Sequence, residues 1–204
     1  LKGAQLSKKL EEIYQALRKT TTEESFPGFS SLIEQLSQDY FLKSGNKNVA
    51  QLVGYCVVEV FRINEGIGFP DSSSANALHL IIHNLRALEL PSKTELYQRS
   101  FEMFEKLYQT SLLKVMVSLS DEGEELTIEL SRVIFSILES LSTSASPKKK
   151  GKRKTPPKKA QGGNADSSSA LTEEEMQTER EKAKRVSIEI LISIIDLYKH
   201  VPEG

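Results

Sequence analysis

The sequence predicts an all-α fold, built as a solenoid of about three stacked helix pairs. Three observations predict it. Apolar residues recur at helical spacing through most of the 204 residues. No segment shows convincing strand-like alternation. The starts of the predicted helices repeat at a period in the forties.

The clearest predicted helix covers residues 49–60. Its apolar residues are spaced by three and four, which places them in one stripe with a period of 3.6: Val49, Leu52, Val53, Cys56, Val57 and Val60. Gly45 and Asn46, which are typical of a turn, come just before it. Although several of these residues are β-branched, the spacing is not the two-residue alternation of a strand.

The same spacing predicts the other helices in order. They cover residues 3–17, 27–42, 74–88, 94–109 and 124–141, with a short connecting helix over 112–119. Pro27 suits a first helical position, and Pro91 prevents the preceding helix from continuing.

A last helix is predicted from Thr172 to about His200. Thr172 and Glu175 have the spacing of a capping box. Residues 173–185 are polar all round, so we expect them to project into solvent. The second half is rich in isoleucine and leucine, so we expect deep burial.

The helix starts indicate the repeat. First helices of each pair are expected near residues 29, 75 and 123, and second helices near 49, 94 and 172. The interval from 94 to 172 is longer than the others, but it agrees with them if the polar residues 142–170 are an insertion. Two helices per unit with this period are typical of HEAT or armadillo repeats, each stacking on its neighbours. The alternative is an irregular helical bundle, and the agreement of both series favours the solenoid.

Three regions follow from these patterns. Residues 1–141 are expected to form N-terminal HEAT-type repeats, and residues 171–204 to supply a final helix that completes the array. Residues 142–170 are rich in Ser, Lys, Pro and Gly with almost nothing to bury, so they are expected to form a disordered basic insertion.

Charge is distributed unevenly. The chain has 27 Lys and Arg against 28 Asp and Glu, a formal net charge of −1. Eight basic residues and no acidic one lie in residues 147–159, so the rest carries −9. The predicted fold is therefore acidic and one segment is strongly basic.

Several function classes lack support. No apolar run is long enough for a membrane span. The single cysteine, Cys56, allows no internal disulfide and fits a reducing compartment. The chain has no initiator Met and no signal peptide, so we expect it to be part of a larger protein.

Catalytic patterns are also missing. The sequence has no Gly-rich phosphate loop and no Cys pair, so neither an enzyme nor a cofactor is predicted. His79 and His83 have a spacing that can hold a metal, but no third ligand lies nearby. We expect them at the boundary between core and water, and predict no metal site.

The basic segment is the strongest local motif. It is typical of a nuclear-import signal, made by Lys148, Lys149, Lys150, Lys152, Arg153 and Lys154. Such a run also makes weak, nonspecific contact with DNA phosphates, and the plain alternative is a solvated loop. Ser146 and Thr155 each precede a proline and a downstream lysine, which makes both candidates for proline-directed phosphorylation.

Residues 37–63 carry a family resemblance. They combine Phe41-Leu42, a turn at Asn46-Lys47-Asn48-Val49, and a second helix ending in Phe61-Arg62-Ile63. This order resembles the N-terminal HEAT repeats of the Pds (precocious dissociation of sisters) family of cohesin regulators. Helices over residues 78–88, 96–107 and 125–138 resemble the family's next helices in order. The chain is identified as a diverged member over about residues 32–141.

The resemblance implies a non-enzymatic cohesin regulator that acts in the nucleus on chromatin. Implied partners are cohesin complex components, a Wapl-type releasing factor and the cohesin acetyltransferase, with no membrane and no small-molecule substrate. The alternative is a generic nuclear helical-repeat scaffold with weak, nonspecific DNA contact through the basic loop.

The family also implies a place for partner binding. After Phe-Arg-Ile it carries a Tyr- and Pro-rich run linked to binding short peptide motifs, and here residues 64–70 stand in that place. The candidate partner-binding residues are Arg62, Asn64, Glu65, Ile67 and Phe69. Arg62 and Glu65 offer charge, whereas Ile67 and Phe69 offer apolar anchors. The alternative is a plain turn between repeats.

Overall fold

The computed structural model describes residues 3–21, 28–64, 69–90, 94–143 and 173–199. Every regular element in these ranges is helical. The elements are α1 (Gly3–Lys19), α2 (Phe29–Leu36), α3 (Asp39–Leu42), α4 (Lys47–Asn64), α5 (Asp71–Leu85), η1 (Arg86–Glu89), α6 (Glu95–Gln109), α7 (Leu112–Val117), α8 (Ser120–Thr143) and α9 (Glu173–Lys199).

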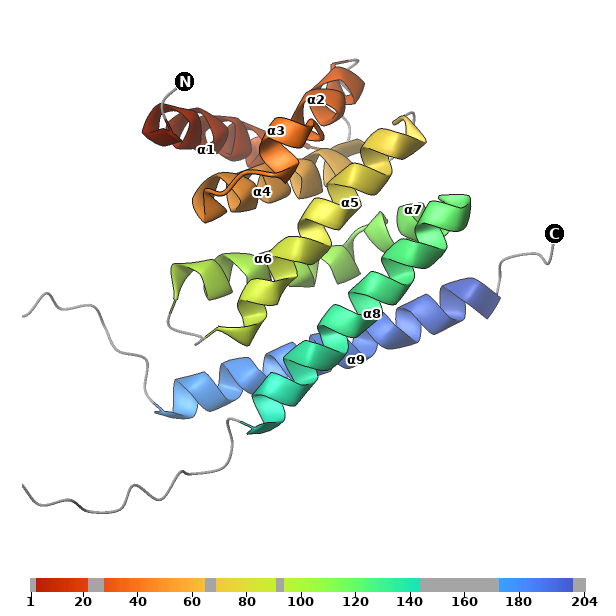
Figure 1. Ribbon diagram of the computed structural model, residues 1–204. Helices are drawn as coiled ribbons and strands as arrows, with labels where there is room; N and C mark the ends of the chain where they lie inside the picture. Colours follow the sequence, from red (N-terminus) through yellow and green to blue (C-terminus); the bar gives the residue numbers. More distant parts are fainter. Residues whose placement is uncertain (1–2, 22–27, 65–68, 91–93, 144–172, 200–204) are drawn as a thin grey trace, which may run out of the picture.

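The helices stack in two layers (Figure 1). One layer holds α1, α4, α6 and α9 in succession, and the other holds α2, α5 and α8. Pairs form between α2 and α4, between α5 and α6, and between α8 and α9. Each pair contacts the next one, as in a solenoid. The all-α, solenoid-like repeat fold predicted from the sequence is confirmed.

The starts of α4 and α6 are each capped by a side chain that accepts hydrogen bonds from free backbone N–H groups. The Oδ1 atom of Asn46 accepts hydrogen bonds from the amides of Asn48 (3.1 Å) and Val49 (3.4 Å) at the start of α4. Thr94 does the same for α6, where its Oγ1 accepts from the amide of Tyr97 at 3.1 Å. Both are N-caps, and each contributes about 1 kcal/mol to stability.

The single helix predicted over residues 27–42 is wrong. The chain forms α2 and α3 instead, separated by Ser37 and Gln38. Gln38 has an extended backbone (φ −70°, ψ 147°), which ends helical propagation. The hydroxyl of Ser37 donates to the carbonyl of Ser73 at 3.0 Å, so the break is fixed by a contact with α5. Pro27 lies outside the described residues.

The two expectations for the last helix are also wrong. In its second half, Ile190 and Ile194 are buried, but Ile188, Ile192 and Ile195 are 51%, 53% and 56% exposed. The isoleucines surround the helix, so one face cannot bury them all. The first half does not project freely.

Instead, the first half of α9 packs against α6. Ala183 in this half has no exposed surface. Burial and the nearby carboxylate of Glu179 raise the pKa of Tyr97, a residue of α6, to about 12. One side of this polar segment therefore lies against a neighbouring helix rather than in solvent.

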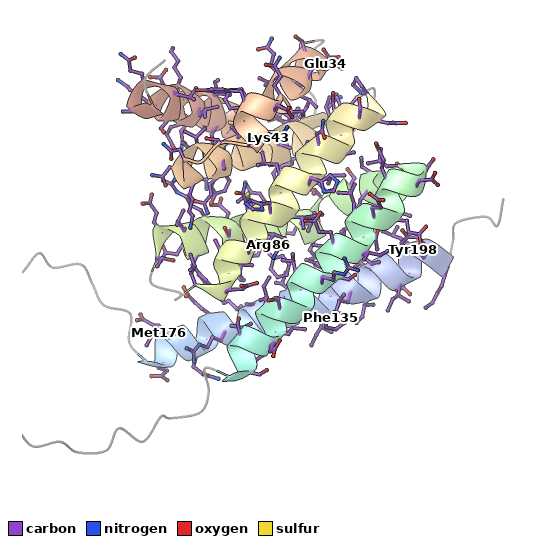
Figure 2. The ribbon with its side chains drawn as sticks, in the orientation of Figure 1. Glu34, Lys43, Arg86, Phe135, Met176 and Tyr198 are labelled. Atoms are coloured by element: carbon purple, nitrogen blue, oxygen red, sulfur yellow. The ribbon has the colours of Figure 1, made fainter. Side chains whose placement is uncertain are left out.

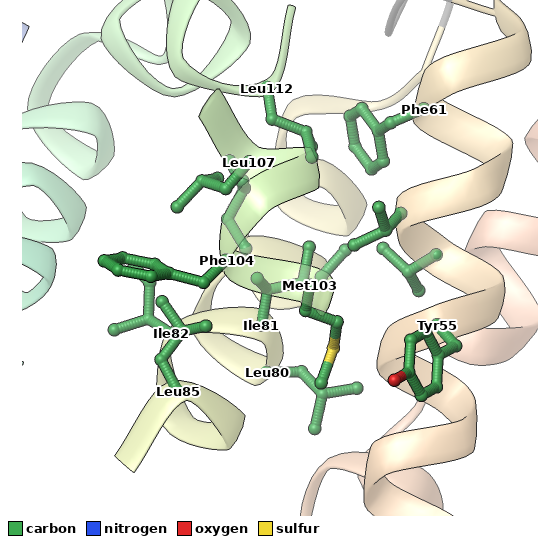
Figure 3. Close-up of a cluster of buried hydrophobic side chains, with 14 of the residues drawn as sticks. Tyr55, Phe61, Leu80, Ile81, Ile82, Leu85, Met103, Phe104, Leu107 and Leu112 are labelled. Atoms are coloured by element: carbon green, nitrogen blue, oxygen red, sulfur yellow. The ribbon is translucent and has the colours of Figure 1, made fainter. Parts of the chain in front are cut away.

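The core runs between the layers (Figure 3). Large buried side chains from α4, α5, α6 and α7 interdigitate there, including Phe61, Ile81, Ile82, Met103, Phe104, Leu107 and Leu112. Burying each contributes roughly 1.5–3 kcal/mol. By contrast, Phe135 and Tyr198 lie on the outside of α8 and α9, 61% and 39% exposed (Figure 2).

Gly54 sets how closely three helices approach. A Cβ at this position of α4 would lie 2.6 Å from Nδ2 of Asn84 on α5 and 3.0 Å from Sδ of Met103 on α6. Glycine is therefore required by packing here. None of the described helices is both long and apolar enough to cross a membrane.

Candidate functional site

The predicted partner-binding residues begin on the last turn of α4. Arg62 is only 28% exposed. Its Nη2 atom donates to the carbonyls of Leu17 (3.1 Å) and Thr20 (3.0 Å), at the end of α1. The carbonyl of Leu17 also accepts a hydrogen bond from the amide of Thr20 at 3.1 Å, so the guanidinium adds a second donor there and helps to satisfy the C-terminus of α1. Arg62 thus has a structural role in holding α1 against α4.

Phe69 lies where the chain returns from the loop. It is 8% exposed, and its ring meets that of Phe61 edge to face, with centroids 5.1 Å apart. This is a favoured aromatic geometry. Asn64 is half-buried at the end of α4, whereas Glu65 and Ile67 lie outside the described residues. The side chains of Arg62 and Phe69, one on each side of the loop, therefore pack into the protein and do not point into solvent.

A buried carboxylate lies one turn before Arg62 on α4. Glu59 is 1% exposed and accepts a hydrogen bond from Nε of Arg62 at 2.6 Å. It also forms an ion pair with Lys106 of α6. Burial acts to raise the pKa of Glu59, but the hydrogen bonds and charges of Lys106 and Arg62 outweigh it and hold the pKa below its usual value. Glu59 therefore stays charged and joins α4 to α6.

A second carboxylate extends this network. Glu102 of α6 accepts hydrogen bonds from the hydroxyls of Tyr14 and Tyr55, each at 3.3 Å, and lies 3.7 Å from Lys106. The tyrosine rings are tilted against each other, with centroids 4.8 Å apart. Burial, followed by the charge of Glu102, raises the pKa of both tyrosines. Both hydroxyls therefore stay protonated as donors and link α1 and α4 to α6.

This network was missed in the sequence. A signal for it exists, because Glu59 interrupts the apolar run Val57, Val58 and Val60. A charged residue at the centre of an apolar stripe requires a buried partner. The partner could not be read from the sequence, since Lys106 is 47 positions away.

The histidine pair and the single cysteine noted in the sequence are both described by the structure. The Nδ1 atom of His79 lies 2.7 Å from Oε2 of Glu129, which joins α5 to α8, and His83 is exposed. Within the described ranges, no three His, Cys, Asp or Glu side chains are grouped to hold a metal ion. Cys56 has no exposed surface, and burial raises the pKa of its thiol to about 12.

The basic segment lies in the part of the chain that the structure does not describe. This covers the predicted import signal, residues 148–154, and the predicted phosphorylation sites Ser146 and Thr155. The described polar clusters are hydrogen-bonded between helices. This arrangement fixes the relative placement of the helices, and it suits a binding scaffold.

Comparison with known proteins identifies similar sequences. A family model described as sister chromatid cohesion protein PDS5 matches residues 4–151. The chain is also 29% identical over 119 residues to sister chromatid cohesion protein PDS5 homolog A-B of Xenopus laevis. That match covers 57% of this chain but 9% of the Xenopus protein, so the chain spans a small part of its relative's length.

Proposed function

Because the chain belongs to the PDS5 family of sister chromatid cohesion proteins, we propose that it regulates sister chromatid cohesion as a non-enzymatic scaffold. The observation that carries this proposal is the family match, which covers α1 to α8. The helical-repeat fold supports it, because stacked helix pairs present extended surfaces for partners. The proposed site of action is chromatin in the nucleus.

The proposed partners are cohesin complex components, a Wapl-type releasing factor and the cohesin acetyltransferase. We propose that short peptide motifs of such partners bind at the loop between α4 and α5. The contacts of Arg62 with α1 and of Phe69 with Phe61 support this proposal. They hold the chain in place before and after residues 64–68. Contacts would then fall to Asn64, Glu65 and Ile67, with Arg62 and Phe69 shaping the loop.

Domain organisation fits the same proposal. Residues 1–141 would form the repeats and residues 171–204 would complete the last helix pair. The basic residues between them, 142–170, would form an insertion that carries the import signal. Phosphorylation at Ser146 or Thr155 would offset part of its positive charge.

A pull-down tests the partner assignment. The chain would be offered purified cohesin subunits, the Wapl-type factor and the acetyltransferase, beside an E65K/I67D variant. This variant spares Arg62, whose loss would also release α1. E124Q, an exposed substitution on α8 with the same +1 change in net charge, is the control for altered charge. Capture that is lost only with E65K/I67D supports the loop; no capture by a folded, helical chain contradicts the partner proposal.

A second candidate is a nuclear scaffold with weak DNA contact. The observation that favours it is the run of basic residues in an otherwise acidic chain. Affinity for duplex DNA would then fall steeply with salt and disappear when residues 148–159 are deleted. DNA binding that survives this deletion would contradict it.

A further inference from the structure

A hollow lies at the opposite end of α4 from the predicted partner loop. It has a volume of about 330 Å³ and is bounded by the start of α4, the end of α5 with η1, and the start of α6. A hollow of this size holds one or two side chains of a bound segment and is near the lower limit for ligand sites.

The charged groups of this hollow all have the same sign. Lys47 and Arg86 lie on its wall together with His83, and among the described residues no carboxylate side chain lines it. In the part of the chain that the structure describes, neither Lys47 nor Arg86 forms an ion pair, whereas Lys43 nearby pairs with Asp39 at 2.7 Å. Figure 2 shows Arg86 at the end of α5. The hollow is therefore a basic site on an otherwise acidic fold.

Part of the remaining wall is apolar, and its base is held by hydrogen bonds. Ala87, Leu90 and Leu96 supply apolar surface, and Leu90 is 39% exposed. Gln51, 2% exposed, donates from Nε2 to the carbonyl of Leu96 (2.9 Å) and to Oγ of Ser100 (3.0 Å). These bonds join α4 to α6, so the hollow is preformed, which lowers the entropy cost of binding.

The side-chain oxygen of Gln51 has no hydrogen-bond donor among the described residues. This Oε1 atom is buried. A buried acceptor without a donor costs free energy.

We propose that this hollow binds a short acidic peptide segment of a partner protein. One apolar side chain of the segment would lie against Ala87, Leu90 and Leu96, and flanking Asp or Glu residues would pair with Lys47 and Arg86. Lys47 and Arg86 complement the charge of this occupant, whereas nucleic acid carries a phosphate at every nucleotide and would bring more negative charge against the acidic fold than a few Asp or Glu residues do. The apolar wall favours a peptide over a free anion. The proposal does not rest on the loop between α4 and α5.

Two matched peptide pools test it. Both are short, fluorescein-labelled and carry one central Leu or Phe, with flanking positions randomised over Asp, Glu and Ser in one pool and over Lys, Arg and Ser in the other. Binding is measured by fluorescence polarisation, and the contact surface is mapped by amide chemical shifts. The acidic pool is expected to bind at least about tenfold more tightly than the basic pool.

Variants identify the surface. K47E/R86E is expected to weaken the acidic pool by about tenfold. K8E/K19E, with the same change in net charge on α1, is expected to change it by less than about twofold. E65K/I67D is expected to leave it intact, which separates this site from the partner loop. Equal binding of both pools, an equal loss in K8E/K19E, or shifts away from the hollow would overturn the proposal.

Discussion

Arg62 and Glu59 lie one helical turn apart on α4, and Nε of the arginine donates to Oε2 of the buried glutamate at 2.6 Å. The same guanidinium donates to two carbonyls at the end of α1, while Glu59 also pairs with Lys106 of α6. These two residues therefore connect three successive helices of one layer. The relative placement of α1, α4 and α6 depends on charged contacts as well as on the apolar core.

The first prediction concerns the carboxylate of Glu59. E59Q removes the carboxylate that pairs with Arg62 and Lys106 in a mostly buried place, and it leaves Lys106 only the longer 3.7 Å contact with Glu102. We expect a loss of about 3 kcal/mol in the free energy of unfolding at neutral pH, measured by urea denaturation. A loss indistinguishable from zero would mean that the ion pairs do not stabilise the fold.

The second prediction concerns the pH dependence of the same effect. The pKa of Glu59 is lowered from 4.5 by folding, so its contribution is present above that pH and is lost as the pH falls through the native pKa. The stability difference between the native sequence and E59Q should therefore shrink in acid. A difference that stays constant or grows from neutral pH to acid contradicts this assignment.

The third prediction concerns the attachment of α1. R62M removes the donors to the carbonyls of Leu17 and Thr20, so the end of α1 should fray. Amide hydrogen exchange in its last turn should become faster, with a loss of about 2 kcal/mol in stability. R18M, an exposed change on the same helix, is the control. Equal protection in both variants would show that Arg62 does not hold α1.

The fourth prediction concerns the close approach at Gly54. G54A adds a Cβ that must displace Asn84 and Met103, so we expect a loss of about 1–3 kcal/mol. G45A is the matched control, because a Cβ there meets nothing within 4 Å. Thermal unfolding of both variants measures the difference. Equal midpoints would show that the three helices can separate to admit a methyl group.

The fifth prediction concerns the thiol of Cys56. It has no exposed surface, and burial raises its pKa to about 12, so the reactive thiolate is scarce at neutral pH. A thiol-specific disulfide reagent should label it only as fast as the chain opens, and readily in denaturant. Rapid labelling of the native protein would contradict its placement in the core.

Much of the fold could be predicted because periodicity reports burial directly. The stripe from Val49 to Val60 is buried, and the paired helix starts correspond to pairs in the structure. The break at Ser37 could not be predicted, since it depends on a contact with Ser73, which is 36 positions away. The two-sided exposure of α9 was missed because its isoleucines do not follow a single stripe.

The candidate site was less predictable than the fold. The family resemblance placed the loop at the end of α4, and the family itself is confirmed. It could not show that Arg62 and Phe69 turn inward, because their partners Leu17 and Phe61 are set by tertiary packing. Lys47 and Arg86 come together for the same reason, since no local motif joins them.

We propose that this protein regulates cohesion by binding the cohesin machinery. The most direct test is immunoprecipitation of the tagged protein from nuclease-treated nuclei, with bound proteins identified by mass spectrometry. Nuclease treatment removes capture that depends only on shared DNA. We predict enrichment of cohesin subunits or their regulators over a tag-only control, with a weaker signal from E65K/I67D. No enrichment of any cohesin-associated protein by the folded, nuclear protein would contradict the claim.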